Sequence, residues 1–222
     1  MTENIPVVTI DGPSGVGKGT LSRMLANHLK WHYLDSGAIY RALAIAAINH
    51  NIGFDNKQSL SLLAEHLDIK FKNNKLILEG EDITDQIRLP KCSKYASQIA
   101  SLDYIREKLI QRQRKFRKLP GLIADGRDMG TVIFKHATVK LYIVADVNVR
   151  AERREKQLIE QNIKVSYNQV LEEMKKRDES DINRKYAPLV PASDAIILDN
   201  TNKSIEDCFR FCLSKIQTVT LD

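Results

Sequence analysis

The fold of this chain is decided by the stretch Ile10-Asp11-Gly12-Pro13-Ser14-Gly15-Val16-Gly17-Lys18-Gly19-Thr20. An apolar, β-branched run over residues 7–10 leads into it, and apolar side chains at helical spacing follow it from Leu21 to Leu29. The order strand, glycine-rich turn, helix is therefore predicted. Such a turn has the composition that a backbone needs to wrap around a polyphosphate.

Each residue type in this loop has a physical task. Glycines lack Cβ, so the chain can take positive φ and turn successive backbone N–H groups toward phosphate oxygens. Lys18 supplies a mobile positive charge, and a helix that begins near Gly19 adds the partial positive charge of its N-terminus. A purely structural turn is the alternative, but G-x-x-x-x-G-K between a strand and a helix favours phosphate binding. The loop residues expected to contact a nucleotide are Gly12, Pro13, Ser14, Gly15, Val16, Gly17, Lys18, Gly19 and Thr20.

One position departs from the usual motif. Gly19 stands where a Mg²⁺-binding Ser or Thr is usual, and the hydroxyl arrives one residue later at Thr20, which stays an uncertain metal ligand. The run Gly-Lys-Gly-Thr resembles the nucleoside monophosphate kinases and the adenylate kinase group, where phosphates and water complete the metal's shell. The chain also has no Asn-Lys-x-Asp run to read guanine, which argues against a signalling GTPase.

Composition limits the partners. The 222 residues suit one domain with a small insertion, and no stretch has the pattern of a membrane span or a signal peptide, so a cytoplasmic protein is expected. The net charge of +6 comes from 34 basic and 28 acidic residues that interleave, which is typical of solvated helix faces. We therefore expect small-molecule partners, no nucleic acid and no membrane. Cys92, Cys208 and Cys212 are interpreted as small buried hydrophobes.

The next part of the chain predicts a second strand at residues 31–34 and a helix over about residues 38–49, with Ser36 as its N-cap. Alternating apolar residues about Asn73-Asn74 then predict a β-hairpin, with a further short strand after it. Strands that follow one another so closely leave no room for the helix of a βαβ unit. We therefore predict a core domain over residues 1–66 and 119–222, and an inserted monophosphate-binding subdomain over residues 67–118.

Two later features suggest chemistry. An apolar strand over residues 122–125 ends in Asp125, which is expected to lie near the phosphate loop and to hold Mg²⁺ through water, with simple turn capping as the alternative. Arg127 and Asp128 follow at the same strand end and are available to a second substrate. Arg41 could face a phosphate near a helix start or could be an ordinary surface residue.

A helical hairpin is predicted over about residues 147–183, because a charged run near Arg150 precedes the capping-box pattern Ser166 to Gln169. Its arginines, Arg153 among them, could close over ATP as a lid that excludes water, with an ordinary charged hairpin as the alternative.

Three charged residues near the end of that hairpin share one predicted helix face. Arg177, Asp181 and Arg184 stand at i, i+4 and i+7, and the spacing by itself favours simple ion pairing. The functional alternative gives the arginines to phosphates and the carboxylate to a ribose hydroxyl. A core strand over residues 195–199 and an amphipathic helix from Ser204 complete the chain.

Four stretches together resemble the bacterial-type cytidylate kinases: Asp11 to Thr20, Leu34 to Arg41, Leu119 to Thr131 and Arg184 to Ala192. The resemblance covers nearly the whole chain. It implies an α/β P-loop NTPase fold with a five-stranded parallel sheet flanked by helices, an inserted β-hairpin subdomain and a helical lid. It also implies transfer of the terminal phosphoryl group of ATP to CMP or dCMP in pyrimidine nucleotide metabolism, with Mg²⁺.

The resemblance also implies roles for single residues. Cytosine would be read by Ser97, Arg106 and Asp128, and the sugar would be held by Asp181. Arg41, Arg127 and Arg184 would bind the phosphate, and catalysis would depend on Lys18, Arg127 and Arg184. The full set of residues expected to bind the monophosphate is Ser36, Arg41, Ser97, Arg106, Arg127, Asp128, Arg177, Asp181 and Arg184.

Two other functions are consistent with parts of the sequence. A kinase for another acceptor, such as UMP, AMP or a metabolite alcohol, would share the loop and the lid. A nucleic-acid-binding ATPase would use the basic run between Arg106 and Lys118, although this run lacks interleaved aromatic residues for base stacking. No conspicuous apolar seam argues for a dimer, so a monomer is expected.

Overall fold

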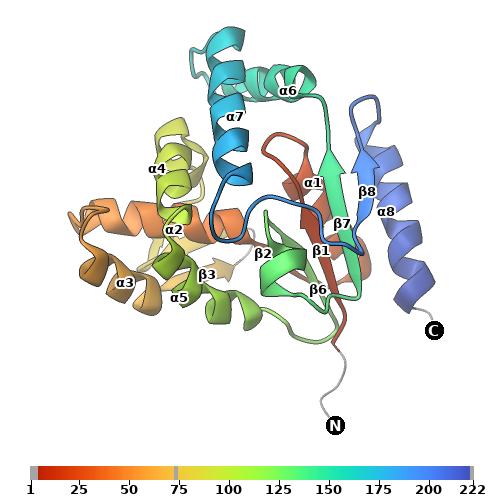
Figure 1. Cartoon of the computed structure of the whole chain (residues 1–222), viewed down its shortest axis with the longest axis horizontal. Coiled ribbons are helices and arrows are strands. Elements are labelled where there is room, and N and C mark those ends of the chain that lie inside the picture. The colour runs from red at the N-terminus through yellow and green to blue at the C-terminus, as the bar shows by residue number, and fades with distance from the viewer. Residues whose placement is uncertain (1–4, 73–74, 221–222) are drawn as a thin grey trace. The chain divides into compact units, whose positions relative to one another are not determined.

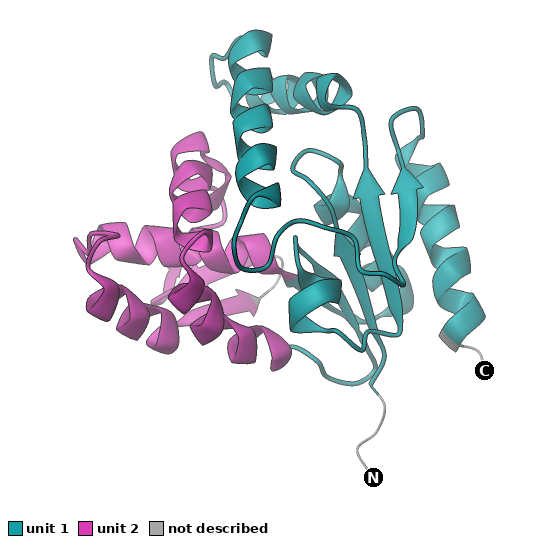
Figure 2. Ribbon diagram, viewed as in Figure 1, with its two compact units in different colours: residues 1–34, 116–222 teal, residues 35–115 magenta. Residues whose placement is uncertain are grey.

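The computed structural model describes residues 5–72 and 75–220 (Figure 1). The chain divides into two compact units (Figure 2). The first contains residues 1–34 and 116–222, and the second contains residues 35–115. Each unit is described by itself.

A five-stranded sheet forms the centre of the first unit, in the order β2-β6-β1-β7-β8. β1 lies between β6 and β7 and pairs with both in parallel, and β7 pairs in parallel with β8. The strands are β1 (Val7–Asp11), β2 (His32–Asp35), β6 (Leu122–Asp125), β7 (Val139–Val144) and β8 (Ile196–Asp199). The α/β fold predicted from the strand–loop–helix pattern is therefore confirmed.

Helices cover this sheet because their apolar faces and its β-branched strands bury one another. α1 follows the glycine-rich loop, and α8 packs against α1 and β7. The buried core includes Ile10, Leu25 and Ile143, together with Cys208 and Cys212, which are buried as predicted. The helices of this unit are α1 (Lys18–Leu29), α6 (Val147–Glu160), α7 (Tyr167–Ile182) and α8 (Ile205–Thr220), with a short wide turn η2 (Met129–Ile133).

α6 and α7 form the predicted helical hairpin. Ala151, Leu158, Val170 and Met174 are buried together between the two helices. The capping box is present, because the hydroxyl of Ser166 accepts from the backbone N–H of Gln169 while the Gln169 side chain accepts from the backbone N–H of Ser166.

The second unit contains helices and a small antiparallel sheet in the order β3-β4-β5. Ile69 pairs with Leu78 and Phe71 with Leu76, as the alternation about the predicted hairpin requires. The predicted turn at Asn73-Asn74 lies outside the described residues. The elements are α2 (Ser36–Asn49), α3 (Lys57–His66), β3 (Ile69–Lys72), β4 (Lys75–Leu78), β5 (Glu81–Asp82), η1 (Gln86–Arg88), α4 (Pro90–Ala100) and α5 (Asp103–Arg114).

Two local features differ from the sequence prediction. The N-cap of α2 is Asp35 and not Ser36, because a carboxylate oxygen of Asp35 accepts from the N–H of Ala38 at 2.8 Å. The second compact unit also begins at Asp35, well before the predicted start of the insertion at residue 67. The reason is tertiary packing. α2 packs on α4 and α3 packs on α5, so α2 and α3 belong to the same unit as the β3-β4 hairpin.

Candidate functional site

The glycine-rich loop connects β1 to α1 and takes the left-handed conformations that its glycines allow. Gly15 and Gly17 have φ of 79° and 83°, and Gly12 has φ of 144°. A Cβ placed on Gly12 would lie 2.1 Å from the backbone oxygen of Ile143 in β7. The loop is therefore held against the central sheet at a distance that only glycine permits.

Lys18 is the first residue of α1 and its side chain turns back into the loop. Its Nζ donates to the carbonyl of Pro13 at 2.7 Å, and only 5% of the residue is exposed. Burial, and after it the nearby charge of Arg127, lowers the pKa of Lys18 to about 7, although Asp125 and Asp11 act to raise it. An anion bound in the loop would favour the charged amine, so the site is suited to a polyphosphate.

Asp125 lies at the C-terminal end of β6, as predicted, and next to the start of α1. A Cβ built on Gly19 would lie 3.4 Å from Oδ2 of Asp125, and the Tyr33 hydroxyl donates to the same oxygen at 3.1 Å. Thr20 is exposed. Within the described parts of the chain, no three His, Cys, Asp or Glu side chains gather as a metal site. A single carboxylate beside a phosphate loop fits Mg²⁺, which takes most of its ligands from phosphates and water.

Asp11 organises the segment that follows Asp128. Its carboxylate accepts from the backbone N–H of Met129 at 2.9 Å and of Gly130 at 2.8 Å. Burial raises the pKa of Asp11 to about 7, although the hydrogen bonds from Gly130 and Met129 lower it in part. Sequence reasoning placed Asp11 in the phosphate loop but did not find this role, since its partners lie more than a hundred residues away.

This raised pKa predicts a pH dependence of stability. The ordinary pKa of this carboxyl group is 3.8. Between pH about 4 and 7 the folded chain therefore binds more protons at Asp11 than the unfolded chain, and the free energy of unfolding falls as the pH rises. Between pH 5 and pH 8, the free energy of unfolding measured in urea should fall by at least ~1 kcal/mol more for wild type than for Asp11→Asn, since one pKa unit is about 1.4 kcal/mol. Glu173→Gln, which alters an exposed carboxylate of α7, should behave like wild type. Equal pH profiles for wild type and Asp11→Asn would contradict the assignment.

A buried carboxylate between two arginines lies where α7 ends. Nε of Arg127 donates to Oδ2 of Asp181 at 2.9 Å, and Arg184 is paired with Oδ1 of the same residue. The Asp181 side chain is only 1% exposed. Burial acts to raise the pKa of Asp181, but Arg127, Arg184 and Arg177 outweigh it and hold the pKa below its ordinary value.

The ion pairing that the spacing favoured is thus present between Arg184 and Asp181. The single helix face predicted for Arg177, Asp181 and Arg184 is wrong in one respect, because α7 ends at Ile182 and Arg184 lies beyond it. Beyond the helix the backbone N–H of Leu189 donates to the Asp181 carbonyl at 2.8 Å, so the chain turns back toward the end of α7.

Four predicted residues belong to the second unit. Arg41 pairs with Asp35 at 3.0 Å, so the anion that compensates this arginine near a helix start is a side chain of the same unit. The Ser36 hydroxyl donates to Gln113 at 2.6 Å, and neither Asp35 nor Gln113 was identified from the sequence. Placing both needed the tertiary structure, although Asp35 before a helix start is a recognisable capping signal.

Arg106 is 3% exposed, donates to the carbonyl of Ala100 at 3.1 Å and lies 5.6 Å from the ring centroid of Tyr40. Ser97 is half-buried on α4. In the first unit Asp128 is buried, directly before η2. Arg106 and Asp128 are therefore buried within their own units, and Ser97 is partly exposed.

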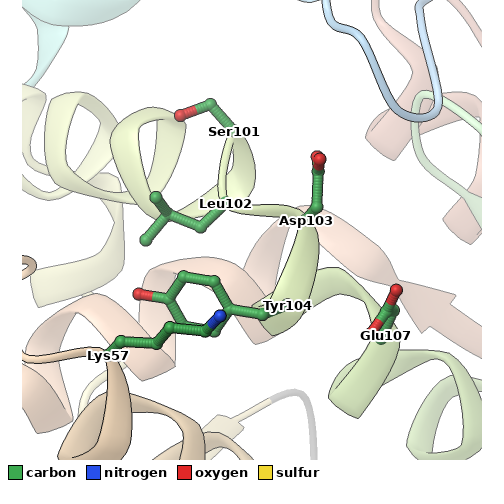
Figure 3. A pocket seen from close by; sticks show the side chains of 6 residues that line it. All are labelled: Lys57, Ser101, Leu102, Asp103, Tyr104 and Glu107. Atoms are coloured by element: carbon green, nitrogen blue, oxygen red, sulfur yellow. The ribbon is translucent and has the colours of Figure 1, made fainter.

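The second unit also contains a surface hollow that none of these residues lines. It has a volume of about 500 Å³ and is lined by Lys57, Ser101, Leu102, Asp103, Tyr104 and Glu107 (Figure 3). The Lys57 amine lies 5.1 Å from the centroid of the Tyr104 ring. No residue predicted to bind nucleotide lines this hollow, so it is not the candidate site.

Comparison with known proteins decides the family. The sequence model described as cytidylate kinase matches residues 8–218. This chain belongs to the cytidylate kinase family. A cytidylate kinase of Shewanella halifaxensis is 53% identical over 97% of this chain and 96% of its own length, and that of Shewanella baltica strain OS155 is 52% identical with the same coverage.

The fold is also similar to the solved structure of an uncharacterized protein from Eubacterium ventriosum, with a TM-score of 0.53 and 12% identity over 96% of this chain and 98% of that chain. The family resemblance noted from four sequence stretches is confirmed, and the chain is a member of a kinase family. In residues 5–72 and 75–220, no helix is both long enough and apolar enough to cross a membrane.

The arginines of the helical hairpin do not all have the environment expected of lid residues. Arg153 donates to Oδ1 and the carbonyl of Asn200 and to the carbonyl of Thr201. Arg150 is 5% exposed and contacts the phosphate loop. The sequence did not identify Asn200 or assign Arg150 a site role, because no local pattern connects either residue to the loop.

Proposed function

We propose that this chain transfers the terminal phosphoryl group of ATP to CMP or dCMP, giving ADP and CDP or dCDP. The observation that carries the proposal is the gathering of cations around the phosphate loop in a member of the cytidylate kinase family. Lys18 lies in the loop, and Arg127 and Arg177 are close enough to influence the pKa of its amine. Arg127 shares Asp181 with Arg184.

The mechanism follows from charge. An oxygen of the monophosphate attacks the terminal phosphorus of ATP, and the bond from that phosphorus to the bridging oxygen breaks as ADP leaves. Two unit charges 4 Å apart repel by about 4 kcal/mol at an effective dielectric constant of 20. Lys18, Arg127 and Arg184 offset this repulsion and align the two phosphates. No general base is needed, because the attacking oxygen is already ionised.

The metal has a defined place in this proposal. We infer that Asp125 holds Mg²⁺ through water, and the ion, when bound, neutralises charge on the phosphates of ATP. Thr20 is a weaker candidate because it is exposed.

We also propose the acceptor contacts implied by the family resemblance. Arg41, Arg127 and Arg184 bind the phosphate, and their planar guanidinium groups suit its oxygens. Ser97, Arg106 and Asp128 read cytosine. Asp181 holds the sugar, because its carboxylate is held ionised by its arginines and can accept from a sugar hydroxyl. Ser36 and Arg177 also bind the monophosphate.

The proposal extends to the setting of the enzyme. The loop and Arg153 bind ATP, the 67–118 segment contributes to monophosphate binding, and the hairpin 147–183 acts as the lid. The expected protein is a monomer that acts in the cytoplasm in pyrimidine nucleotide metabolism, without nucleic acid or membrane partners.

An acceptor panel tests the function. ADP formation from ATP and Mg²⁺ would be measured with CMP, dCMP, UMP, AMP and GMP in turn, and without acceptor. We expect turnover chiefly with CMP and dCMP, because the donors and acceptors of Ser97, Arg106 and Asp128 are proposed to match cytosine and would not match a purine base. Preference for another base would overturn the roles of Ser97, Arg106 and Asp128. Hydrolysis that needs no acceptor and rises with added RNA or DNA would support an ATPase instead.

A further inference from the structure

Two carbonyl groups of the phosphate loop are held from outside by buried side chains. The carbonyl of Ser14 accepts from Arg150 at 3.0 Å, and the carbonyl of Val16 accepts from Nδ2 of Asn200 at 2.6 Å. We propose that Arg150 and Asn200 are positioning residues that set the phosphate loop in its anion-binding conformation before ATP arrives. This inference rests on the proposed binding of ATP by the loop.

Arg150 has the contacts of a fixed support. Besides the Ser14 carbonyl, its Nε donates to the carbonyl of Ala145 at 3.1 Å, and its Nη1 pairs with Asp178 of α7 at 2.7 Å. Its side chain is 6% exposed. The Arg150 Cβ would lie 3.3 Å from a Cβ placed on Gly15, so the stem of this arginine packs directly against the loop. Asp178 offsets the charge of Arg150. The arginine therefore contributes by orienting and packing against the loop, and not by adding net positive charge there.

Asn200 supports the loop from the end of β8. Its backbone N–H donates to the carbonyl of Val144 at 2.9 Å, which fixes it against β7. Its side-chain oxygen accepts from Arg153 at 3.2 Å, and this orients the amide so that Nδ2 faces Val16. Arg153 and Arg150 both lie on α6, so one helix helps to hold both carbonyls.

The geometry of the peptide bond converts these contacts into an effect on phosphate binding. In a trans peptide the N–H points opposite to the preceding carbonyl. With the carbonyls of Ser14 and Val16 held outward, the N–H groups of Gly15 and Gly17 point away from Arg150 and Asn200, toward the inside of the loop. Both glycines have left-handed φ, as concave arrangements of N–H groups require. Preset donors bind an anion without a further ordering cost.

The test measures binding of ATP with Mg²⁺ by calorimetry, without acceptor, and binding of CMP separately. Asn200→Asp keeps the shape of the side chain but places a carboxylate oxygen against the Val16 carbonyl, so two acceptors face each other. Arg150→Met is made together with Asp178→Asn, because the half-buried carboxylate of Asp178 would otherwise lose its partner. Asp178→Asn alone is the reference. Asn202→Asp and Lys203→Met make the same charge changes at exposed positions nearby.

We expect the Kd for ATP to rise about tenfold or more in Asn200→Asp and in the Arg150 variant. This is the size expected when one backbone N–H of the loop no longer donates well to a charged phosphate oxygen. The Kd for CMP should stay within about twofold, and the two exposed controls should bind ATP like wild type. Unchanged ATP affinity in both loop variants would overturn the proposal, as would equal losses for ATP and CMP. Wild type that binds ATP without phosphorylating CMP would count against the proposed function and not against the positioning role.

Discussion

Lys18→Ala is expected to lower kcat by on the order of 10³ or more, because it removes the loop's mobile positive charge from the phosphates during transfer. The same change should leave thermal stability equal or higher. Burial lowers the pKa of Lys18 to about 7, which shows that the folded chain disfavours its charge. A lower kcat together with equal or higher stability is expected when the removed group destabilises the fold but is needed for catalysis.

Steady-state kinetics with saturating ATP and CMP, together with thermal unfolding, check this prediction. Lys203→Ala removes the same charge from an exposed position and should change neither quantity. Near-normal kcat in Lys18→Ala would remove this residue from the proposed site. A large fall in the unfolding temperature would instead show that the amine is needed for folding.

Arg127→Ala is expected to lower kcat by on the order of 10³ or more and also to destabilise the chain. The arginine is proposed to hold the transferring phosphate, and a single such cation has effects of this size. It also pairs with Asp181, whose side chain is 1% exposed, so its removal leaves a buried carboxylate with weaker compensation. In this respect Arg127 differs from Lys18.

The matched control is Arg210→Ala, which removes an arginine from the pair that Arg210 and Asp207 form on α8 at 2.6 Å. Both partners there are more than half exposed, so little change in stability or kcat is expected. Arg127→Lys keeps the charge but loses the planar fork, and its kcat should lie between those of wild type and Arg127→Ala. Activity of Arg127→Ala close to that of wild type would exclude the proposed phosphate contact.

Much of the fold could be predicted from local patterns. The phosphate loop, the strand before it, the helix after it and the helical hairpin each have a signal within a few residues, such as the glycines of the loop or the capping box at Ser166. The boundary of the second unit was harder to predict, because α2 has no local feature that assigns it to the second unit rather than to the first. Its packing against α4 decides this.

The candidate site divides in the same way. Lys18, Asp125 and Arg127 were identified because loop and strand-end positions have a known chemical use. Asp35 was missed as a cap and as the partner of Arg41, since both roles depend on side-chain geometry in the folded unit. Arg184 was placed on a helix that in fact ends at Ile182.

The sequence by itself determined that a glycine-rich loop joins the first strand to the first helix, with the composition used to bind phosphate, because this property depends on residue types at short spacing. Only the tertiary structure decided which side chains support that loop. Asn200 lies 184 residues from Val16 along the chain, yet its amide holds that carbonyl at 2.6 Å. Such a contact depends on the order of strands in the sheet, which brings the end of β8 to the loop after β1, and no local pattern encodes it.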